Sequence, residues 1–181
     1  MRKSFVVVSG LPGSGKTTVA RALAPALALP VIDKDDILED LFEARGIGDM
    51  AWRRALSRES DATLQARALE ADGALLSSFW HVSGMLQDSG TPIEWLTSPA
   101  HRVVMLECRC PADIAAARFL RRRRHPGHLD EGRDATEVVA SLTELSALGR
   151  PPIEPCLEVD TTKPVPVGEL ARKLRDLLGR D

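Results

Sequence analysis

The stretch that decides the fold is Ser4-Phe5-Val6-Val7-Val8-Ser9, followed at once by Gly10-Leu11-Pro12-Gly13-Ser14-Gly15-Lys16-Thr17. The first part is an apolar run with the length of a buried strand, and the second has the spacing G-x-x-x-x-G-K-T. A helical pattern continues from about residue 15 to residue 24 or beyond, and Pro25 is expected to disturb its end. This spacing is specific for phosphate binding when a strand precedes it and a helix follows, and both flanks are present.

The composition of the loop agrees with that chemistry. Its glycines allow backbone angles that other residues avoid, so successive N–H groups can turn toward phosphate oxygens at the positive end of the next helix. Lys16 is expected to bridge the terminal phosphates, and Thr17 is expected to be a ligand of Mg²⁺. We therefore expect ATP and Mg²⁺ as cofactors, bound by Gly10, Leu11, Pro12, Gly13, Ser14, Gly15, Lys16, Thr17 and Thr18.

Beyond the loop, short β-rich runs alternate with helical patterns, which predicts crossover units and a parallel sheet. The predicted strands are 4–9, 30–33, 74–79, 102–107 and 156–159. The predicted helices after the first are 36–44, 51–72, 113–124, 136–148 and 166–178, whereas 81–100 follows no clear pattern. With no repeat or linker, 1–181 is expected to be a single α/β domain.

The overall charge of the chain limits its partners. The formal net charge is -2 and charged residues make up 28% of the chain, so no general attraction to nucleic acid or an anionic membrane is expected. The longest apolar stretch, 19–32, contains an arginine and two prolines and is no membrane span. Three cysteines form no even framework, which favours reduced thiols and a cytoplasmic protein. The oligomeric state cannot be predicted from these features.

Among phosphate-loop proteins, the length of this chain favours a small nucleoside or metabolite kinase. A hexameric ATPase core with its lid would need a longer chain, and no guanine-specificity motif is present. An acidic pair at the end of an apolar strand is also missing, Glu107 being the nearest candidate.

Three aspartates, Asp33, Asp35 and Asp36, stand where the second strand ends and a helix begins. In a parallel sheet this is the edge that also carries the phosphate loop. A carboxylate there can accept a proton from an acceptor hydroxyl. One of the three is expected to cap the helix, and we assign that role to Asp36 or Asp35.

An arginine run, Arg118, Arg121, Arg122, Arg123 and Arg124, follows the fourth strand. Helical spacing places Arg118 and either Arg121 or Arg122 on one face. Arginines that close over a transferring phosphoryl group stabilise its charge, although a solvated basic helix end is the alternative for any single one. The proline and glycine of 125–128 are typical of a turn at the tip of a mobile lid, placed at about 118–135, rather than of a zinc site.

Together these residues resemble the chloramphenicol phosphotransferase-like group of small P-loop kinases, within the AAA-type and zeta-toxin-like P-loop kinases. The similarity is sharp at the phosphate loop, at Asp35, which matches the proposed base of that group, and at 157–162, which matches its last strand and adenine loop. The resemblance implies a three-layer α/β/α, adenylate-kinase-like core with strand order 2-3-1-4-5, and Thr162 beside the adenine. It also implies phosphorylation of a hydroxyl group on a small molecule, a metabolite or an antibiotic. The predicted catalytic residues are Lys16, Asp35, Arg118 and Arg122, with Arg118 also a nucleotide contact.

One departure concerns the third strand, which ends in Ser77-Ser78-Phe79 where such enzymes often carry acidic residues. The second Mg²⁺ contact would then be made through water or by Asp33 or Asp35. Two other functions remain open: a nucleoside or polynucleotide 5′-hydroxyl kinase, and an ATP-binding regulatory or toxin-like module with little turnover. Against the polynucleotide kinases, Leu38 stands where they carry an arginine. The sequence does not identify the acceptor.

Overall fold

The computed structural model describes residues 2–86 and 89–179. Its strands are β1 (Lys3–Ser9), β2 (Val31–Asp33), β3 (Gly73–Ser77), β4 (His101–Arg109) and β5 (Cys156–Asp160). Its α-helices are α1 (Lys16–Leu27), α2 (Lys34–Arg45), α3 (Met50–Glu70), α4 (Ala112–Arg121), α5 (Ala135–Ala147) and α6 (Val167–Leu178). Two 3₁₀ turns, η1 (Glu94–Thr97) and η2 (Pro126–His128), lie between them.

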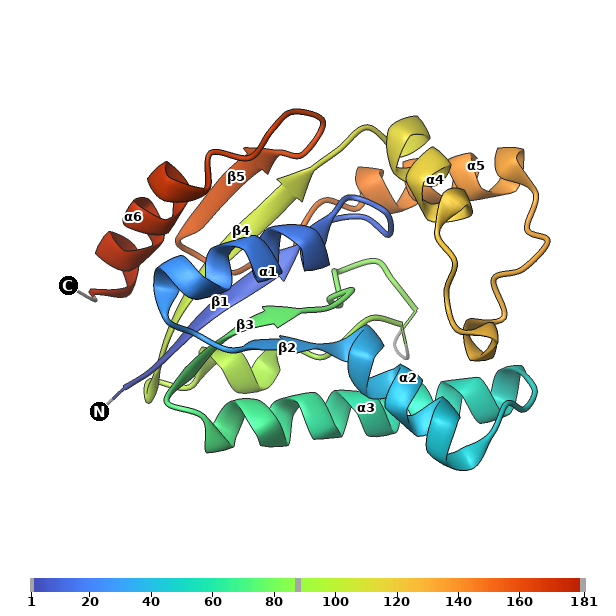
Figure 1. Ribbon diagram of the computed structural model, residues 1–181, viewed down its shortest axis with the longest axis horizontal. Coiled ribbons are helices and arrows are strands. Elements are labelled where there is room, and N and C mark those ends of the chain that lie inside the picture. Colours follow the sequence, from blue (N-terminus) through green and yellow to red (C-terminus); the bar gives the residue numbers. More distant parts are fainter. Residues whose placement is uncertain (1, 87–88, 180–181) are drawn as a thin grey trace.

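The strands form one parallel sheet in the order β2-β3-β1-β4-β5, with helices on both faces (Figure 1). The fold predicted from the sequence, a P-loop α/β/α protein with strand order 2-3-1-4-5, is therefore confirmed. No helix within the described ranges is long and apolar enough to cross a bilayer.

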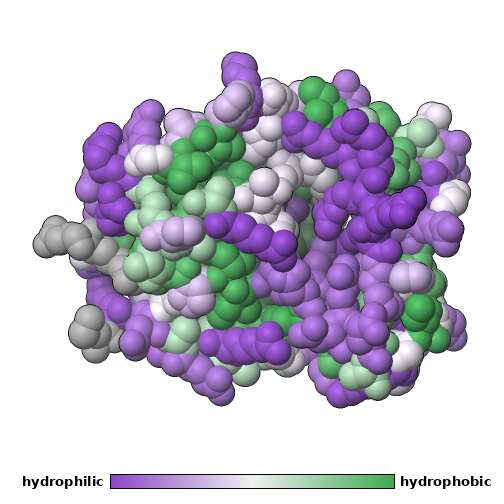
Figure 2. Space-filling view, in the orientation of Figure 1, coloured by the Kyte–Doolittle hydropathy of each residue, from purple (hydrophilic) through white to green (hydrophobic). Residues whose placement is uncertain are grey.

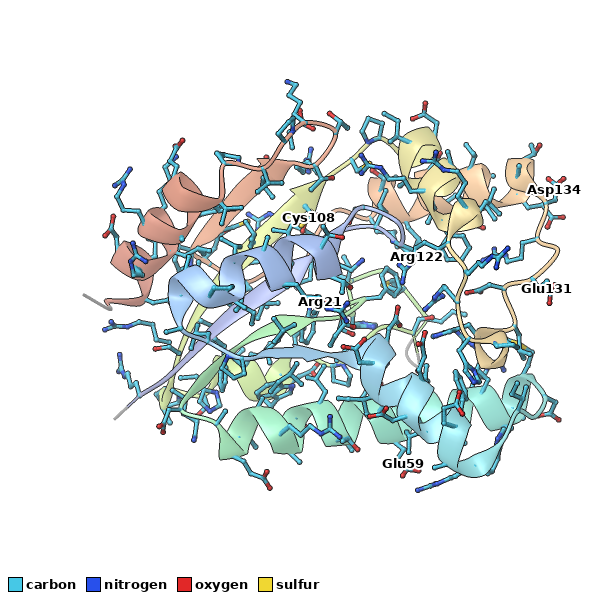
Figure 3. All side chains as sticks on the ribbon, in the orientation of Figure 1. Arg21, Glu59, Cys108, Arg122, Glu131 and Asp134 are labelled. Atoms are coloured by element: carbon cyan, nitrogen blue, oxygen red, sulfur yellow. The ribbon has the colours of Figure 1, made fainter. Side chains whose placement is uncertain are left out.

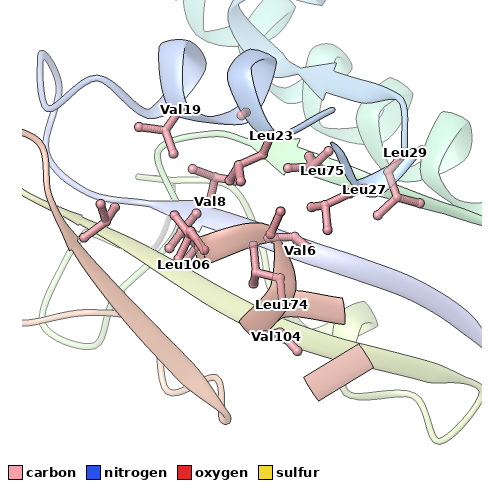
Figure 4. Packing of buried hydrophobic residues seen from close by; sticks show 14 of the residues in the cluster. Val6, Val8, Val19, Leu23, Leu27, Leu29, Leu75, Val104, Leu106 and Leu174 are labelled. Atoms are coloured by element: carbon pink, nitrogen blue, oxygen red, sulfur yellow. The ribbon is translucent and has the colours of Figure 1, made fainter. Parts of the chain in front are cut away.

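The central strand β1 shows why the sheet has two covered faces. Its side chains alternate between two buried clusters, as strand geometry requires. Val6 and Val8 pack against α1 and α6, as Figure 4 shows around Leu23 and Leu174. Phe5 and Val7 face the other way, in the cluster that contains the buried residues of α3 and η1. A continuous apolar run in the sequence is thus a strand buried on both sides.

The strand registers bring polar residues to one edge of the sheet. Ser9 at the end of β1 is in register with Glu107 on β4, and the preceding Val8 is in register with Ser77 on β3. Ser77 is in turn in register with Asp33, the last residue of β2. The phosphate loop begins directly after Ser9, so it lies at the edge that carries these polar groups.

Several predicted boundaries are wrong, for identifiable reasons. Helix α2 begins at Lys34 with no intervening loop, because Asp33 both ends β2 and caps the helix. Helix α1, by contrast, runs past Pro25 to Leu27, which agrees with a predicted end at or beyond residue 24, since its buried leucines keep packing against the sheet. Helix α4 ends at Arg121, so Arg122, Arg123 and Arg124 lie outside the helix that was predicted to reach residue 124.

The sequence pattern predicted no secondary structure for residues 81–100. Side-chain and backbone contacts of Trp80 anchor the start of this segment. Trp80 forms an isolated bridge with Thr91, and its indole Nε1 donates to the carbonyl of Val8 at 3.0 Å. Its side chain belongs to the core, with 2% of the residue exposed. Trp80 is therefore a structural anchor between this segment and the strand that leads into the phosphate loop.

Candidate active site

The phosphate loop has a backbone that only glycine can adopt at its tightest points. Gly13 has a φ of 82°, and a Cβ atom there would lie 2.2 Å from the carbonyl oxygen of Ala115 in α4. Gly10 has a φ of 135°, and its Cβ would lie 2.6 Å from the carbonyl of Cys108. The loop is therefore held against β4 and α4 by close backbone approach, which leaves its inner N–H groups free to meet an anion.

Lys16 spans the inside of the loop. Its ammonium group donates to the carbonyls of Gly10 at 2.7 Å and Leu11 at 2.9 Å. Burial lowers the pKa of Lys16, although the nearby thiol and carboxyl groups act in the opposite direction. The hydroxyl of Ser14 is buried in the same loop and has no hydrogen-bond partner among the described residues. A buried cation and an unpartnered donor inside a loop of N–H groups fit the phosphates of a nucleotide.

A carboxylate and a hydroxyl suited to Mg²⁺ lie beside the loop. The Thr17 hydroxyl donates to Asp33 Oδ2 at 2.6 Å, and Asp33 is only 5% exposed. Burial raises the pKa of Asp33, and the described chain supplies no cation in an ion pair with it. A hard divalent ion held by one hydroxyl, one carboxylate, phosphate oxygens and water would compensate this charge. The residues present therefore fit Mg²⁺ bound with ATP, the cofactors that this fold family implies.

Helix α2 is capped by Asp33 and not by Asp35 or Asp36, so the predicted cap is wrong. Asp33 Oδ1 accepts a hydrogen bond from the backbone N–H of Asp35 at 2.9 Å. Asp33 thus uses one oxygen for the helix and the other for Thr17. The side chain of Asp35 is left without a role in the helix terminus.

The carboxylate of Asp35 lies next to the arginines that follow α4. Arg124 Nη2 donates to Asp35 Oδ2 at 2.8 Å, and Arg122 Nη2 lies 3.7 Å from the same oxygen. Burial would raise the pKa of Asp35, but Arg124, His128, Lys16 and Arg122 together outweigh it and hold the pKa below its ordinary value. Asp35 is therefore an ionised carboxylate near the phosphate-binding lysine. Figure 3 shows Arg122 between the phosphate loop and the start of α2.

Residues 122–134, which we call the lid, leave the end of α4 and return to α5 after touching α2 (Figure 1). His128 Nε2 lies 2.9 Å from Glu39 Oε1, and His125 Nε2 lies 3.2 Å from Glu43 Oε1. Gly127 packs against the ring of Phe42, where a Cβ atom would approach within 2.5 Å. The lid is thus docked on α2 through Glu39, Phe42 and Glu43, which lie within one turn of that helix. Figure 2 shows that the surface over the lid and the start of α2 is mostly hydrophilic.

The two predicted catalytic arginines lie in different places. Arg118, on α4, donates to the carbonyl of Thr161 at 3.0 Å, beside the predicted nucleotide contact Thr162. Thr162 is itself held by Asp160, whose carboxylate accepts from its hydroxyl at 2.6 Å. Arg122 lies instead with Asp35, because the helix ends before it. Thr18 is exposed on α1 and makes no side-chain hydrogen bond within the described chain.

Two arginines of the site were not identified as site residues from the sequence. Arg124 was counted only as part of the basic run, and no pattern in the sequence separates it from its neighbours. Arg53, on α3, is close enough to Asp35, Asp130 and Arg124 to interact electrostatically with all three. No spacing along the chain connects residue 53 to residue 124. Only the antiparallel packing of α2 and α3 brings Arg53 to the lid.

A cavity of about 540 Å³ borders the phosphate loop at Gly10 and Leu11. Its walls come from the segment after β3, the end of β4 and the end of α5. Phe79, Trp80, Val82 and Met85 of the segment after β3 line it. Small-molecule sites in proteins are concavities of this size.

The comparisons with known proteins agree with this geometry. The AAA domain family matches residues 5–141, and the chain belongs to that family. Cytidylate kinase of Haloarcula marismortui is 33% identical over 102 residues, 52% of each chain. Shikimate kinase of Corynebacterium jeikeium is 41% identical over 73 residues, 37% of each chain. These matches span about half or less of the length of each relative.

Solved structures match over nearly the whole chain. A candidate kinase from Chloroflexus aurantiacus has a TM-score of 0.77 and 25% identity, covering 97% of this chain and 98% of the other. A shikimate kinase from Bacteroides thetaiotaomicron has a TM-score of 0.63 at 19% identity, which shows a common fold.

Proposed function

We propose that this protein is an ATP-dependent kinase that transfers the γ-phosphate of ATP to a hydroxyl group of a small molecule. The observation that carries the proposal is the position of Asp35, an ionised carboxylate just past β2, next to the residues suited to Mg²⁺ and the phosphates. Kinases recur among the relatives and structural neighbours, although they act on different acceptors.

Each residue has a separate task in this proposal. Lys16 and the loop N–H groups bind the phosphates. Thr17 and Asp33 would hold Mg²⁺, which would supply charge neutralisation at the phosphates when bound. Asp35 accepts the proton of the acceptor hydroxyl while the acceptor oxygen bonds to the γ-phosphorus and ADP leaves. Arg122 and Arg118 are placed to stabilise phosphate charge, the first from the Asp35 side and the second from the side of Thr161.

The finer assignment to a chloramphenicol phosphotransferase-like enzyme is supported by the match of Asp35 and of the loop after β5. A metabolite or an antibiotic then has to present its hydroxyl to Asp35. The lid is proposed to cover both substrates, because it reaches α2 from α4 and so crosses the space between the two sides of the site. Coverage by a lid excludes water, which would otherwise compete as the acceptor.

The direct test is a coupled ADP-release assay against hydroxylated metabolites, nucleosides and antibiotics, with mass spectrometry of each reacting mixture. Acceptor-dependent ADP release and a phosphorylated product are expected for at least one compound class. The rate without acceptor measures hydrolysis by water and serves as the baseline. ADP release that no acceptor raises, with no phosphorylated product, would contradict a kinase and favour an ATP-binding module.

A further inference from the structure

The lid and α3 place more positive than negative charge around Asp35. Arg122 and Arg124 both approach its carboxylate, and Arg53 is close enough to interact electrostatically with it. Both terminal nitrogens of Arg124 are paired, one with Asp35 and one with Asp130, although its Nε has no hydrogen-bond partner among the described residues. Its side chain is only 13% exposed. The excess charge therefore belongs to the other two arginines.

Arg53 is the clearest sign that a negative group is missing. It forms no ion pair with any carboxylate of the described chain, and its Nε is buried without a hydrogen-bond partner. Burial lowers the pKa of its guanidinium group despite the attraction of Asp130 and Asp35. Arg53 is half-buried, and its Nε is shut off from solvent. A buried polar group without a partner is costly, and an anionic ligand that pairs with this arginine removes the cost.

Arg122 is similarly under-neutralised. Its one ion pair among the described residues is with Asp35, where Arg122 Nη2 lies 3.7 Å from Oδ2. Arg124 already donates to the same oxygen at 2.8 Å. Arg122 therefore shares one carboxylate oxygen with a better-placed arginine. An anionic group on the acceptor would give Arg122 and Arg53 a partner of their own and would leave the Arg124–Asp35 contact in place.

We propose that the acceptor carries an oxyanion, a carboxylate or a phosphate, next to the reacting hydroxyl, and that Arg53 and Arg122 bind this group. The proposal rests on the kinase function and narrows it to one chemical class of acceptor. Arg53 is the specificity-determining residue, because it approaches from α3 and forms no ion pair within the part of the chain that the structure describes. Arginine suits this task, since its planar fork matches both carboxylate and phosphate oxygens.

The first experiment separates this proposal from the kinase proposal. A metabolite extract is divided by anion exchange into an anionic and a neutral pool, and each is incubated with the protein and γ-labelled ATP. Label is expected in products of the anionic pool only. Label only in the neutral pool would overturn the oxyanion proposal and leave the kinase function intact. Label in neither pool would overturn both.

The second experiment uses matched compounds and a matched variant. Gluconate is compared with neutral glucose, and cytidylate with neutral cytidine, and mass spectrometry locates the new phosphate in each product. Transfer to a hydroxyl is expected to be faster for the anionic member of a pair, whereas transfer to the phosphate of cytidylate does not count as support. The result with gluconate against that with cytidylate shows whether the protein recognises a carboxylate or a phosphate. Equal or faster reaction of the neutral members would contradict the proposal.

For the acceptor so identified, Arg53→Gln is expected to lower kcat/KM about 100-fold, as loss of one partner of a buried charge pair does. The KM for ATP and the melting temperature should stay close to those of the wild type. Arg58→Gln, an exposed arginine on the same helix, is the control and should behave as wild type. If Arg53→Gln keeps the wild-type preference for the anionic acceptor, Arg53 does not read the charge.

Discussion

The phosphate loop and the lid are both charged parts of one site, but they are held in different ways. The loop is fixed by backbone: its glycines pack within contact of the carbonyls of Cys108 and Ala115, and its lysine donates to carbonyls of the loop itself. The lid is fixed on α2 by side chains, through Arg124 with Asp35 and two histidines with glutamates. The loop should thus be insensitive to pH and single charges, whereas the lid should respond to both.

The largest effect is expected from the loop, in activity and not in folding. Lys16→Ala removes the side-chain cation of the loop, so turnover should fall about 100- to 1000-fold. The melting temperature should hardly change, because the backbone and not the lysine builds the loop. Lys173→Ala is the control, since Lys173 makes only an exposed pair with Glu169 on α6. Wild-type turnover in the Lys16 variant would remove the phosphate loop from catalysis.

A middle-sized effect is expected where the lid is attached. Arg124→Gln breaks the link between the lid and Asp35, and turnover should fall about 10- to 100-fold, as for other misplaced catalytic groups. Thermolysin should cut the variant faster near Leu129, and a non-hydrolysable ATP analogue with Mg²⁺ should slow the cutting of the wild type. Arg21→Gln breaks the exposed Arg21–Asp36 pair on α1 and α2 and should leave both readouts unchanged. Identical cutting of all three proteins would show that Arg124 does not hold the lid.

The smallest effect is a pH dependence of lid docking. Burial, with Arg124 nearby, lowers the pKa of His128, and these two effects outweigh Asp35 and Glu39, which act to raise it. A histidine with a lowered folded-state pKa resists protonation, so its contribution to stability is complete above about 6.5, the ordinary histidine pKa. That contribution is lost as the pH falls from there through the folded pKa.

The melting temperature should therefore drop by a few degrees between pH 7.5 and pH 5.5, and thermolysin cutting of the lid should speed up over the same range. In His128→Gln the part of this pH dependence that comes from His128 should vanish. His81→Gln, which replaces a histidine outside the lid, is the comparison variant. An unchanged pH dependence in His128→Gln would assign the effect to other groups.

The difference between the two regions also explains what the sequence could predict. The loop is contiguous in sequence. The side chains of Lys16 and Thr17 form hydrogen bonds to groups no more than 16 positions away, so spacing alone indicates the chemistry of the loop. Strand order was predicted from the family resemblance and is confirmed.

The lid contacts could not be predicted in the same way. Arg124 meets Asp35 across 89 positions, and His128 meets Glu39 across the same separation. The last residue of α4 determines which arginines lie near Asp35. The run of consecutive arginines contains no signal for the position of that helix end. The capping residue was predicted wrongly for a related reason. Asp33 both ends β2 and caps α2, and the spacing of three aspartates does not show which one takes these two roles.

The central claim is that Asp35 is the catalytic base, and Asp35→Asn tests it most directly. The structure already separates Asp35 from the cap, because Asp33 caps α2, so a loss of helix stability is not expected. Asp36→Asn, an exposed neighbour paired with Arg21, is the control.

Melting temperature, Mg-ATP affinity and kcat are measured on both variants with the identified acceptor. For Asp35→Asn we expect kcat to fall about 100-fold or more, as for a lost general base, with Mg-ATP affinity within about twofold of wild type. Weakened Mg-ATP binding that added metal restores would make Asp35 a metal ligand, and near-normal kcat would contradict a base at this position.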